Sequence, residues 1–521
     1  MAARPFPLRR PVLSDALAWA AVACVAGLIL LPLLAVFWRA GGSSLPGPAD
    51  WAALRFTVVQ AVLSALFSVV LAVPVARALA RRQFPGRGAL VTLMGAPFIL
   101  PVIVAVLGLL AVFGRSGIVN QLLGWLGLPQ VQIYGLHGVV LAHVFFNLPL
   151  ATRILLQGWQ SIPAERFRLA ASLGLGPRDV FRLLEWPMLR STLPGVAMVI
   201  FAICLGSFAV ALTLGGGPRA TTVELAIYQA FRFDFDLGRA AVLALIQMAL
   251  VTVTAMLALR FSLLDGFGRG LDRIPRRWEA ETWLLRLLDA LVLGLVALFL
   301  LLPLGAVIWR GVAGMDSLPP QVWRAASVSV VMAFTSTAIT VGLALTFAHL
   351  ARKRQGVEAV GLLGIAVSPL VIGTGLFLLI NPFSDPARLT FAVTVIVNAL
   401  AALPFAMRVL VPALRDVEKD YGPLADSLGM IGMARFRWLI LPRLRRPLGF
   451  AAGLAAALSM GDLGVVALFA DPDRATLPLQ ILRLMGAYRM DAAAGAGLLL
   501  LMISLLLFWL FDQGGRRDVD T

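Results

Sequence analysis

Long apolar stretches recur along the whole chain and are separated by shorter polar segments. Each stretch has about 20 mostly apolar residues, the length that a helix needs to cross a bilayer. The alternation expected of membrane β-strands is absent. The pattern predicts an all-α polytopic membrane protein with about 12 transmembrane helices. We expect the spans at residues 16–38, 56–80, 89–113, 137–158, 193–214, 238–263, 284–309, 325–351, 357–380, 390–412, 447–470 and 493–511.

The amino terminus has a short basic segment, MAARPFPLRR, followed by the first apolar stretch. A secretory signal peptide begins in a similar way. The stretch from Ala16 to Trp38 is longer than the apolar region of a signal peptide, and no convincing small-residue cleavage site precedes Pro32. We therefore interpret it as the first retained transmembrane helix.

Composition agrees with a membrane protein, since 60% of the residues are hydrophobic and the mean hydropathy is +0.90. The net charge of +17 does not indicate a nucleic-acid partner, because the basic residues lie between apolar stretches. Most of the 44 Lys and Arg residues fall in the segments that are cytoplasmic if the amino terminus is inside. We therefore expect a multi-pass protein, in contact with membrane lipid, with both termini cytoplasmic. Cys24 and Cys204 lie within apolar stretches, so we expect no disulfide.

The chain contains an internal repeat. LPLATR at 148–153 matches LPFAMR at 403–408, and SLG at 172–174 matches SLG at 427–429, both 255 positions later. Chance similarity between apolar sequences does not explain a constant spacing through polar loops. Earlier in each half the spacing is near 271, so the second half is about 16 residues shorter after its third span. We predict a first six-helix repeat at 1–265, a cytoplasmic linker at 266–283 and a second six-helix repeat at 284–521.

An even number of spans per half makes the two repeats parallel. Parallel repeats are related by an axis along the membrane normal, which places a pathway between the halves.

Each half has one long polar loop on the cytoplasmic side, at 160–192 and at 415–446. In both loops a helical stretch runs into a glycine, Gly174 or Gly429, and a second stretch reaches a proline 13 residues later, Pro187 or Pro442. Glycine permits a left-handed turn that ends the first helix, and we expect proline to stop the second. The product is a short exposed helix set across the membrane normal.

This arrangement resembles the coupling loop of permeases of ABC importers, which docks onto an ATPase subunit. The family has an acidic residue where this chain has Arg168 and Pro423, so a charge pair at that position is not implied. The positions that match the coupling loop are Ala170, Ala171, Gly174, Leu184 and Pro187 in the first copy, and Ala425, Gly429, Leu439 and Pro442 in the second.

A wider resemblance extends over nearly the whole chain. LAHVFFNLPLATR from Leu141, LGGGPRATTVELAIYQA from Leu214 and GDLGVVALFADPDRATLPL from Gly461 are similar to stretches of thiamine ABC-importer permeases. The resemblance implies the type I importer permease fold in the bacterial inner membrane. It also implies a periplasmic substrate-binding protein, two copies of an ATPase subunit, and thiamine or its phosphate esters as substrate.

The chain itself has no nucleotide-binding loop. Such a loop needs Gly-Lys followed by Ser or Thr, and the only lysines are Lys353 in ARKRQ and Lys419 in EKDYG. We therefore expect no enzyme activity, no bound cofactor and no metal site in this chain. The resemblance implies that ATP and Mg are used by the partner ATPase.

Several polar residues near or within the spans are candidates for the substrate path or for contact with the binding protein. Asp462 lies in an apolar run, and a carboxylate at membrane depth marks either a pathway or an interhelix hydrogen bond. The same two interpretations stand for His143 and Asn147, which share a helix face, and structural bonding is the better one. In the segments after spans five and eleven the candidates are Gly216, Glu224, Tyr228 and Asp471.

Glu224 and Tyr228 are four residues apart. An acid beside an aromatic ring suits a cationic heteroaromatic ligand, and a contact at a helix end explains the pair equally well.

Three alternatives remain. A ferric-iron ABC importer has the same two-half architecture, so the choice of substrate depends on the resemblance alone. An ion-coupled secondary transporter predicts ionisable residues at matched positions, whereas Asp462 corresponds to Ser207. A membrane-embedded enzyme needs converging catalytic groups, and His137, His143 and His349 are scattered in the sequence.

Overall fold

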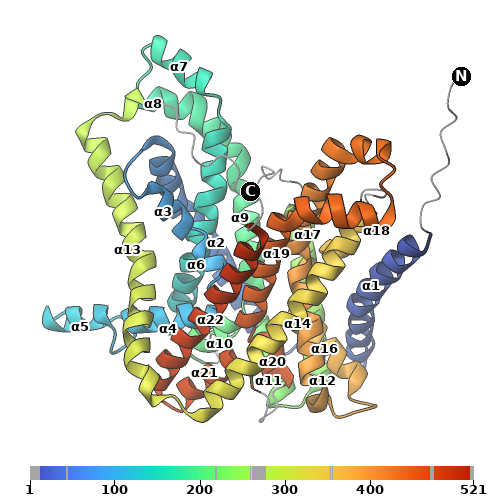
Figure 1. Cartoon of the computed structure of the whole chain (residues 1–521). Coiled ribbons are helices and arrows are strands. Elements are labelled where there is room, and N and C mark those ends of the chain that lie inside the picture. Colours follow the sequence, from blue (N-terminus) through green and yellow to red (C-terminus); the bar gives the residue numbers. More distant parts are fainter. Residues whose placement is uncertain are drawn as a thin grey trace, which may run out of the picture. The chain divides into compact units, whose positions relative to one another are not determined.

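The computed structural model describes residues 12–42, 45–217, 220–258, 260, 277–351, 354, 356–469 and 475–516. In this part of the chain every regular element is a helix (Figure 1), which confirms the all-α prediction. The α-helices are α1 (Val12–Ala40), α2 (Pro48–Arg81), α3 (Arg87–Leu93), α4 (Val102–Phe113), α5 (Ile118–Trp125), α6 (Leu136–Ser161), α7 (Ala164–Ser172), α8 (Pro177–Val180), α9 (Trp186–Leu205), α10 (Ala209–Leu214), α11 (Val223–Arg232), α12 (Leu237–Ala258), α13 (Trp283–Gly314), α14 (Pro320–Ala351), α15 (Gly356–Ala366), α16 (Pro369–Ile380), α17 (Thr390–Ser427), α18 (Gly432–Arg435), α19 (Leu441–Gly461), α20 (Gly464–Phe469), α21 (Leu477–Gly486) and α22 (Met490–Arg516).

Short helical segments of other types join several of these helices. Two π-helical segments, η2 (Phe181–Glu185) and η7 (Phe436–Ile440), lie in the predicted coupling loops. The 3₁₀ segments are η1 (Ala96–Phe98), η4 (Trp278–Ala280), η5 (Met315–Ser317) and η6 (Pro386–Leu389).

Four of the twelve predicted spans are interrupted, namely the third and the fifth of each half. The third spans break before Pro101 and Pro369, which open α4 and α16. The fifth spans break between α9 and α10 and between α19 and α20. Among the described residues, eleven helical stretches are long and apolar enough to cross a membrane, and only the third span of the second half falls short, because α16 is a shorter apolar helix. Apolar composition predicts where the chain lies in the membrane, but it does not show where a helix stops within it.

The helices of the second half follow those of the first at a constant spacing. The π segments lie 255 positions apart, and so do α10 and α20 at both of their ends. Helices α11 and α21 have equal lengths and lie 254 positions apart. The halves differ most after the third span. Twenty-two residues, including α5, separate α4 from α6, whereas nine residues separate α16 from α17.

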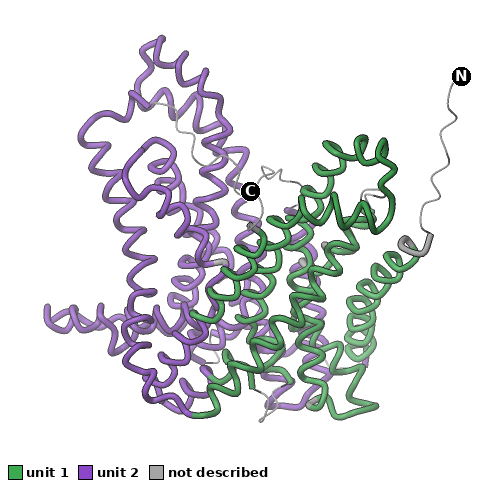
Figure 2. Tube along the Cα trace, viewed as in Figure 1, with its two compact units in different colours: residues 1–41, 320–480, 502–521 green, residues 42–319, 481–501 purple. Residues whose placement is uncertain are grey.

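Contacts divide the chain into two compact units that do not follow the chain order (Figure 2). Unit 2 comprises residues 42–319 and 481–501, so α13 belongs with α2 to α12. There α2 packs against α6 and α9, and α13 packs against α4. Unit 1 comprises residues 1–41, 320–480 and 502–521, so α1 belongs with α14 to α20. There α14 packs against α17 and α19, and α1 packs against α16.

In each unit a glycine lets two helices approach closely. A Cβ atom on Gly108 of α4 would lie 2.6 Å from the carbonyl oxygen of Pro303 in α13. A Cβ atom on Gly375 of α16 would lie 2.3 Å from the carbonyl oxygen of Pro32 in α1. Small residues at such contacts are typical of membrane helix packing. The first helix of each half therefore packs on the third span of the other half in the same way in both units.

Candidate functional site

The first predicted coupling loop, residues 160–192, folds as α7, a tight turn and a second helical stretch. Gly174 has φ of +66°, in the left-handed region, as the sequence predicted. The amide of Leu175 donates to the carbonyl of Ala170 (3.0 Å), and the amide of Gly174 donates to the carbonyl of Ala171 (3.0 Å). These two bonds form a Schellman motif, which ends α7 and reverses the chain.

The second predicted coupling loop, residues 415–446, makes the same turn at the end of α17. Gly429 has φ of +65°. The amide of Met430 donates to the carbonyl of Ala425 (2.9 Å), and the amide of Gly429 donates to the backbone carbonyl of Asp426 (3.1 Å). Ala170 and Ala425 are both buried beneath their turns. The matched alanines and glycines therefore have one local role, which is to shape the turn.

The expectation that Pro187 and Pro442 stop the second helix is wrong. Both prolines lie in the first turn of the next span, α9 or α19, and the helix runs through them. A proline cannot donate to the carbonyl four residues back and clashes with it. The chain accommodates the proline with a π turn. The amide of Trp186 bonds to the carbonyl of Phe181, and the amide of Leu441 bonds to the carbonyl of Phe436, each five residues back.

The two predicted coupling loops, residues 160–192 and 415–446, are called the first and second coupling segments below. Each exposes large apolar side chains at three matched positions. The pairs are Leu169 and Leu424, Leu173 and Leu428, and Leu183 and Trp438, each 255 positions apart and each more than half exposed. Exposed apolar side chains on a polar segment mark a surface for a partner. By contrast, Leu184 and Leu439, which the sequence singled out, are half-buried.

Two of the polar residues predicted within the membrane meet at the break between α9 and α10. His143 Nε2 lies 2.6 Å from the hydroxyl of Ser207, and its Nδ1 lies 3.1 Å from the hydroxyl of Ser64. The Asn147 amide donates to the sulfur of Cys204 (3.3 Å). His143 and Asn147 are both buried, so the structure places them in interhelix bonding around the break.

Two glutamines that the sequence pattern did not single out complete this site. The last carbonyls of a helix have no hydrogen-bond donor within the helix, and the membrane interior offers no water to donate to them. Gln60 of α2 donates to the carbonyl of Cys204 (2.8 Å), and Gln247 of α12 donates to the carbonyl of Leu205 (2.9 Å). Both glutamines are fully buried. A glutamine within a predicted span was the signal that could have identified them.

Glu224 and Tyr228 lie on α11, outside the spans. Glu224 is buried, and its Oε1 lies 3.7 Å from the place that a Cβ atom on Gly206 would occupy, next to the helix break. The Tyr228 ring packs edge-on against the rings of Phe208 (5.3 Å) and Phe233 (5.8 Å). Burial raises the pKa of the Tyr228 hydroxyl, and Arg232 opposes that shift, so the side chain is neutral at physiological pH. The acid and the ring therefore belong to the same neighbourhood as His143.

Gly216 precedes α11 and has φ of +75°, a conformation that favours glycine. A Cβ atom there would lie 3.0 Å from the Cβ atom of Tyr134. The backbone conformation and the close approach to Tyr134 both explain why glycine occupies this position.

The second half repeats the helix break with different side chains. Asp462 caps the end of α19 and lies between α19 and α20. Asn398, 255 positions after His143, donates to the hydroxyl of Ser459 (3.1 Å). Asp471 lies outside the described residues. Where the structure describes the chain, no group of three or more His, Cys, Asp or Glu side chains is placed to hold a metal ion.

Proteins of known name are similar to this chain along nearly its full length. The thiamine transport system permease protein ThiP of Brucella abortus is 40% identical and covers 99% of this chain and 97% of its own length. The protein of the same name from Salmonella typhimurium is 43% identical over 488 residues, which is 90% of each chain. The one from Escherichia coli is 40% identical and covers 96% of each. No protein-family model matches the chain.

One further protein is similar to only part of this chain. The molybdenum transport system permease protein ModB of Azotobacter vinelandii is 32% identical over 178 residues, which is 78% of that protein and 34% of this chain. A shorter permease is thus similar to about a third of this chain. The full-length similarities, together with the all-α membrane fold, show that the chain belongs to the family of thiamine transport system permease proteins.

Proposed function

We propose that the chain is the membrane permease subunit of an ATP-driven, binding-protein-dependent importer that carries thiamine or its phosphate esters across the bacterial inner membrane. The observation that carries the proposal is the pair of coupling segments. They have the same Schellman turn, the same π turn and the same three exposed apolar positions at one spacing. The family resemblance supplies the substrate class.

ATP hydrolysis comes from separate subunits in this proposal. Two matched coupling segments in one chain favour two ATPase copies, one for each segment. The exposed apolar side chains Leu173 and Leu428 are central to these docking surfaces. The permease itself binds neither ATP nor Mg and is not an enzyme. Docking to cytoplasmic ATPases requires both termini to be cytoplasmic.

The binding protein docks at the opposite end of the spans. In unit 2 the amide of Val223, which opens α11, donates to the hydroxyl of Thr57 near the start of α2 (2.9 Å). Arg77, near the other end of α2, contacts the coupling segment through Glu185. In unit 1 the amide of Leu477, which opens α21, donates in the same way to Ser329 near the start of α14 (2.8 Å). Helices α11 and α21 are therefore the matched elements that we assign to the periplasmic side.

The broken fifth spans are the elements that we assign to the substrate path. Interrupted helices at membrane depth place polar groups where a solute passes. Glu224 lies at the break in unit 2, and Asp462 lies at the break in unit 1. A carboxylate beside a break suits the positive charge of thiamine.

The proposal is tested by uptake of labelled thiamine into cells that lack their own importer. The chain is expressed with the binding-protein and ATPase genes that neighbour it, and each component is omitted in turn. Labelled ferric iron is measured in parallel. We expect thiamine uptake that needs all three components. Iron uptake instead would overturn the substrate and keep the class, and uptake by this chain alone would contradict an ATP-driven importer.

A further inference from the structure

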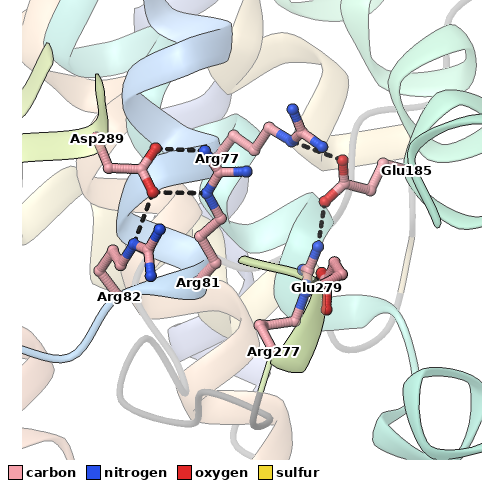
Figure 3. A network of polar contacts seen from close by, with 7 residues as sticks. All are labelled: Arg77, Arg81, Arg82, Glu185, Arg277, Glu279 and Asp289. Atoms are coloured by element: carbon pink, nitrogen blue, oxygen red, sulfur yellow. Dashed lines mark hydrogen bonds and ion pairs between the residues drawn. The ribbon is translucent and has the colours of Figure 1, made fainter. Parts of the chain in front are cut away.

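A buried network of ion pairs lies where the first coupling segment meets the end of α2 (Figure 3). All of its members belong to unit 2, and they come from four separate stretches of the chain. They are Arg77, Arg81 and Arg82 of α2, Glu185 of the π turn, Arg277 and Glu279 of the predicted linker, and Asp289 of α13.

Glu185 is the acid that belongs to the coupling segment itself. Its side chain has no exposed surface. The Nε atom of Arg77 lies 2.7 Å from one carboxylate oxygen, and Nη2 of Arg277 lies 2.5 Å from the other. A buried carboxylate is strongly unfavourable unless it is paired. The two arginines therefore determine where the π turn can lie.

Arg277 connects the linker to both helical parts of the coupling segment. Its guanidinium pairs with Glu185 of the π turn and with Glu279 of the linker. The guanidinium carbon also lies 4.3 Å from the centre of the Phe167 ring, on α7. Only 2% of the Arg277 side chain is exposed, so these contacts are shielded from water. A planar guanidinium can make two directed pairs and a stacking contact at once.

The end of α2 carries the network onward to α13. Arg77 lies over the ring of Phe181, 5.0 Å from its centre, and so contacts the π turn twice. Arg81 and Arg82 both pair with Asp289 in the early part of α13, with Nε to oxygen distances of 2.8 and 2.6 Å. The end of α2 therefore contacts the first coupling segment and α13 directly, and it is joined to the linker through Glu185, which also pairs with Arg277.

The second coupling segment has no equivalent acid. The residue 255 positions after Glu185 is Ile440, which is buried. The ion pairs of this segment involve other positions, and one of them joins Arg415 to Glu358 of α15. Arg435 pairs with Asp426 (2.6 Å) and with Glu418, and both acids lie on α17, which leads into the same turn. Apolar packing at Ile440 gives no directed bond, so this position does not fix the second π turn in the way that Glu185 fixes the first.

We propose that Glu185 and Arg277 are positioning residues that hold the first coupling segment in the orientation in which ATP hydrolysis drives transport, so that the linker is part of the coupling apparatus of this segment. The inference rests on the proposed function. A coupling segment transmits movement only if it does not turn relative to the helices behind it. In the first segment the directed ion pairs prevent that turning, and their loss uncouples hydrolysis from transport without releasing the ATPase.

The test uses the full complex in proteoliposomes, with the binding protein loaded with thiamine. Two quantities are measured, namely the stimulation of ATP hydrolysis by the loaded binding protein and the number of thiamine molecules transported per ATP. The variants are Glu185→Gln, which keeps the shape and removes the charge, and Arg277→Met, which keeps the stem. We expect each to retain ATPase subunits and basal hydrolysis while thiamine per ATP falls at least about fivefold.

The double variant sharpens the test. If Arg277 acts through Glu185, the double variant is no more uncoupled than either single variant. The control is Arg239→Gln, which breaks the pair with the buried Asp50 (2.8 Å) near the other end of α2. This pair lies in the same unit but contacts no coupling segment, so thiamine per ATP is expected to stay at the wild-type value.

The outcomes separate the two proposals. Wild-type hydrolysis that loaded binding protein does not stimulate would overturn the proposed function. If the loaded binding protein stimulates hydrolysis by the wild type, and thiamine per ATP is unchanged in both Glu185→Gln and Arg277→Met, only the positioning role would be overturned. A fall in the amount of complex, with normal thiamine per ATP in the complex that remains, would equally overturn it, because the network would then serve stability alone.

Discussion

The two coupling segments have the same backbone and different surroundings. Both have the glycine turn, the π turn and a proline in the first turn of the following span. Around the first segment, Glu185 is bound by arginines from α2 and from the linker. Around the second, Ile440 packs in the same place, Arg435 pairs with two acids of α17, and Arg415 pairs with Glu358 of α15.

The backbone shape of a segment and the contacts that fix its orientation therefore have different origins. The turn and the π segment follow from glycine and proline, whose backbone chemistry is the same wherever they occur. The support depends on which helices lie behind each segment. Only the first repeat is followed by a linker within this chain, and the first segment is the one that the linker residue Arg277 contacts.

The largest effect is expected from the glycines that both segments share. Gly174→Val and Gly429→Val place a β-branched residue at positive φ, at a cost of about 1–2 kcal/mol each in the native turn. No atom lies within 4 Å of the place that a Cβ atom would occupy on either glycine, so the effect comes from the backbone and not from a clash. We expect the double variant to insert into the membrane and to lose thiamine uptake and ATPase coupling.

The matched control for this prediction is Gly86→Val. Gly86 also has positive φ (+87°) and open space around it, but it lies outside both segments. We expect it to retain uptake. Normal uptake by the double variant would contradict the coupling assignment.

A smaller effect is expected when the first segment is made to resemble the second. Glu185→Ile removes the carboxylate that pairs with Arg77 and one of the two carboxylates that pair with Arg277, and we expect the free energy of unfolding in detergent to fall by about 3–5 kcal/mol. Ile440→Val in the second segment is expected to cost only about 0.5–1.5 kcal/mol. Equal losses for Glu185→Ile and Ile440→Val would remove the difference between the segments.

The prolines give a third test, in which stability and transport are expected to change in opposite directions. Pro187→Ala and Pro442→Ala restore an amide donor and remove the reason for the π turn. Each variant is expected to melt at the same temperature as wild type or higher, since alanine favours a helix. Uptake is expected to fall in both, because an α turn rotates the segment relative to its span. A melting temperature below wild type would contradict this explanation of the π turn.

The smallest effects are expected from charged pairs at the surface. Arg168 pairs with Glu165 (2.8 Å), and both side chains are about three-quarters exposed. Arg168→Gln is expected to change stability by less than about 0.5 kcal/mol, and Arg435→Gln by about 1 kcal/mol, because Arg435 is only 19% exposed and pairs with two acids. Thermal unfolding in detergent measures both. A larger loss for Arg168→Gln would reverse this order.

The features that could be predicted from the sequence depend on local chemistry. Apolar stretches predicted the positions of the spans, and Gly174 and Gly429 predicted the two turns. The breaks in the fifth spans were not predicted, because the side chains that satisfy the free carbonyls come from distant positions. Gln60 bonds to Cys204, 144 residues later in the chain.

The support of the first coupling segment could not be predicted for the same reason. Glu185 and Arg277 are 92 residues apart, and neither lies in a recognisable motif. Pro187 was interpreted as a helix end because proline usually is one. A proline in the first turn of a following helix is equally compatible with the local sequence, and the π turn makes the two helices continuous.

The most direct measurement is cross-linking from the two coupling segments to the ATPase. The exposed Cys24 is first replaced by serine. Leu173→Cys and Leu428→Cys are then made separately, and each places one thiol at one of two matched, exposed positions. We predict that each cysteine links to an ATPase subunit, and that a chain carrying both links to two copies. Linkage from neither position, or from one position only, would contradict the claim that both segments dock ATPase subunits.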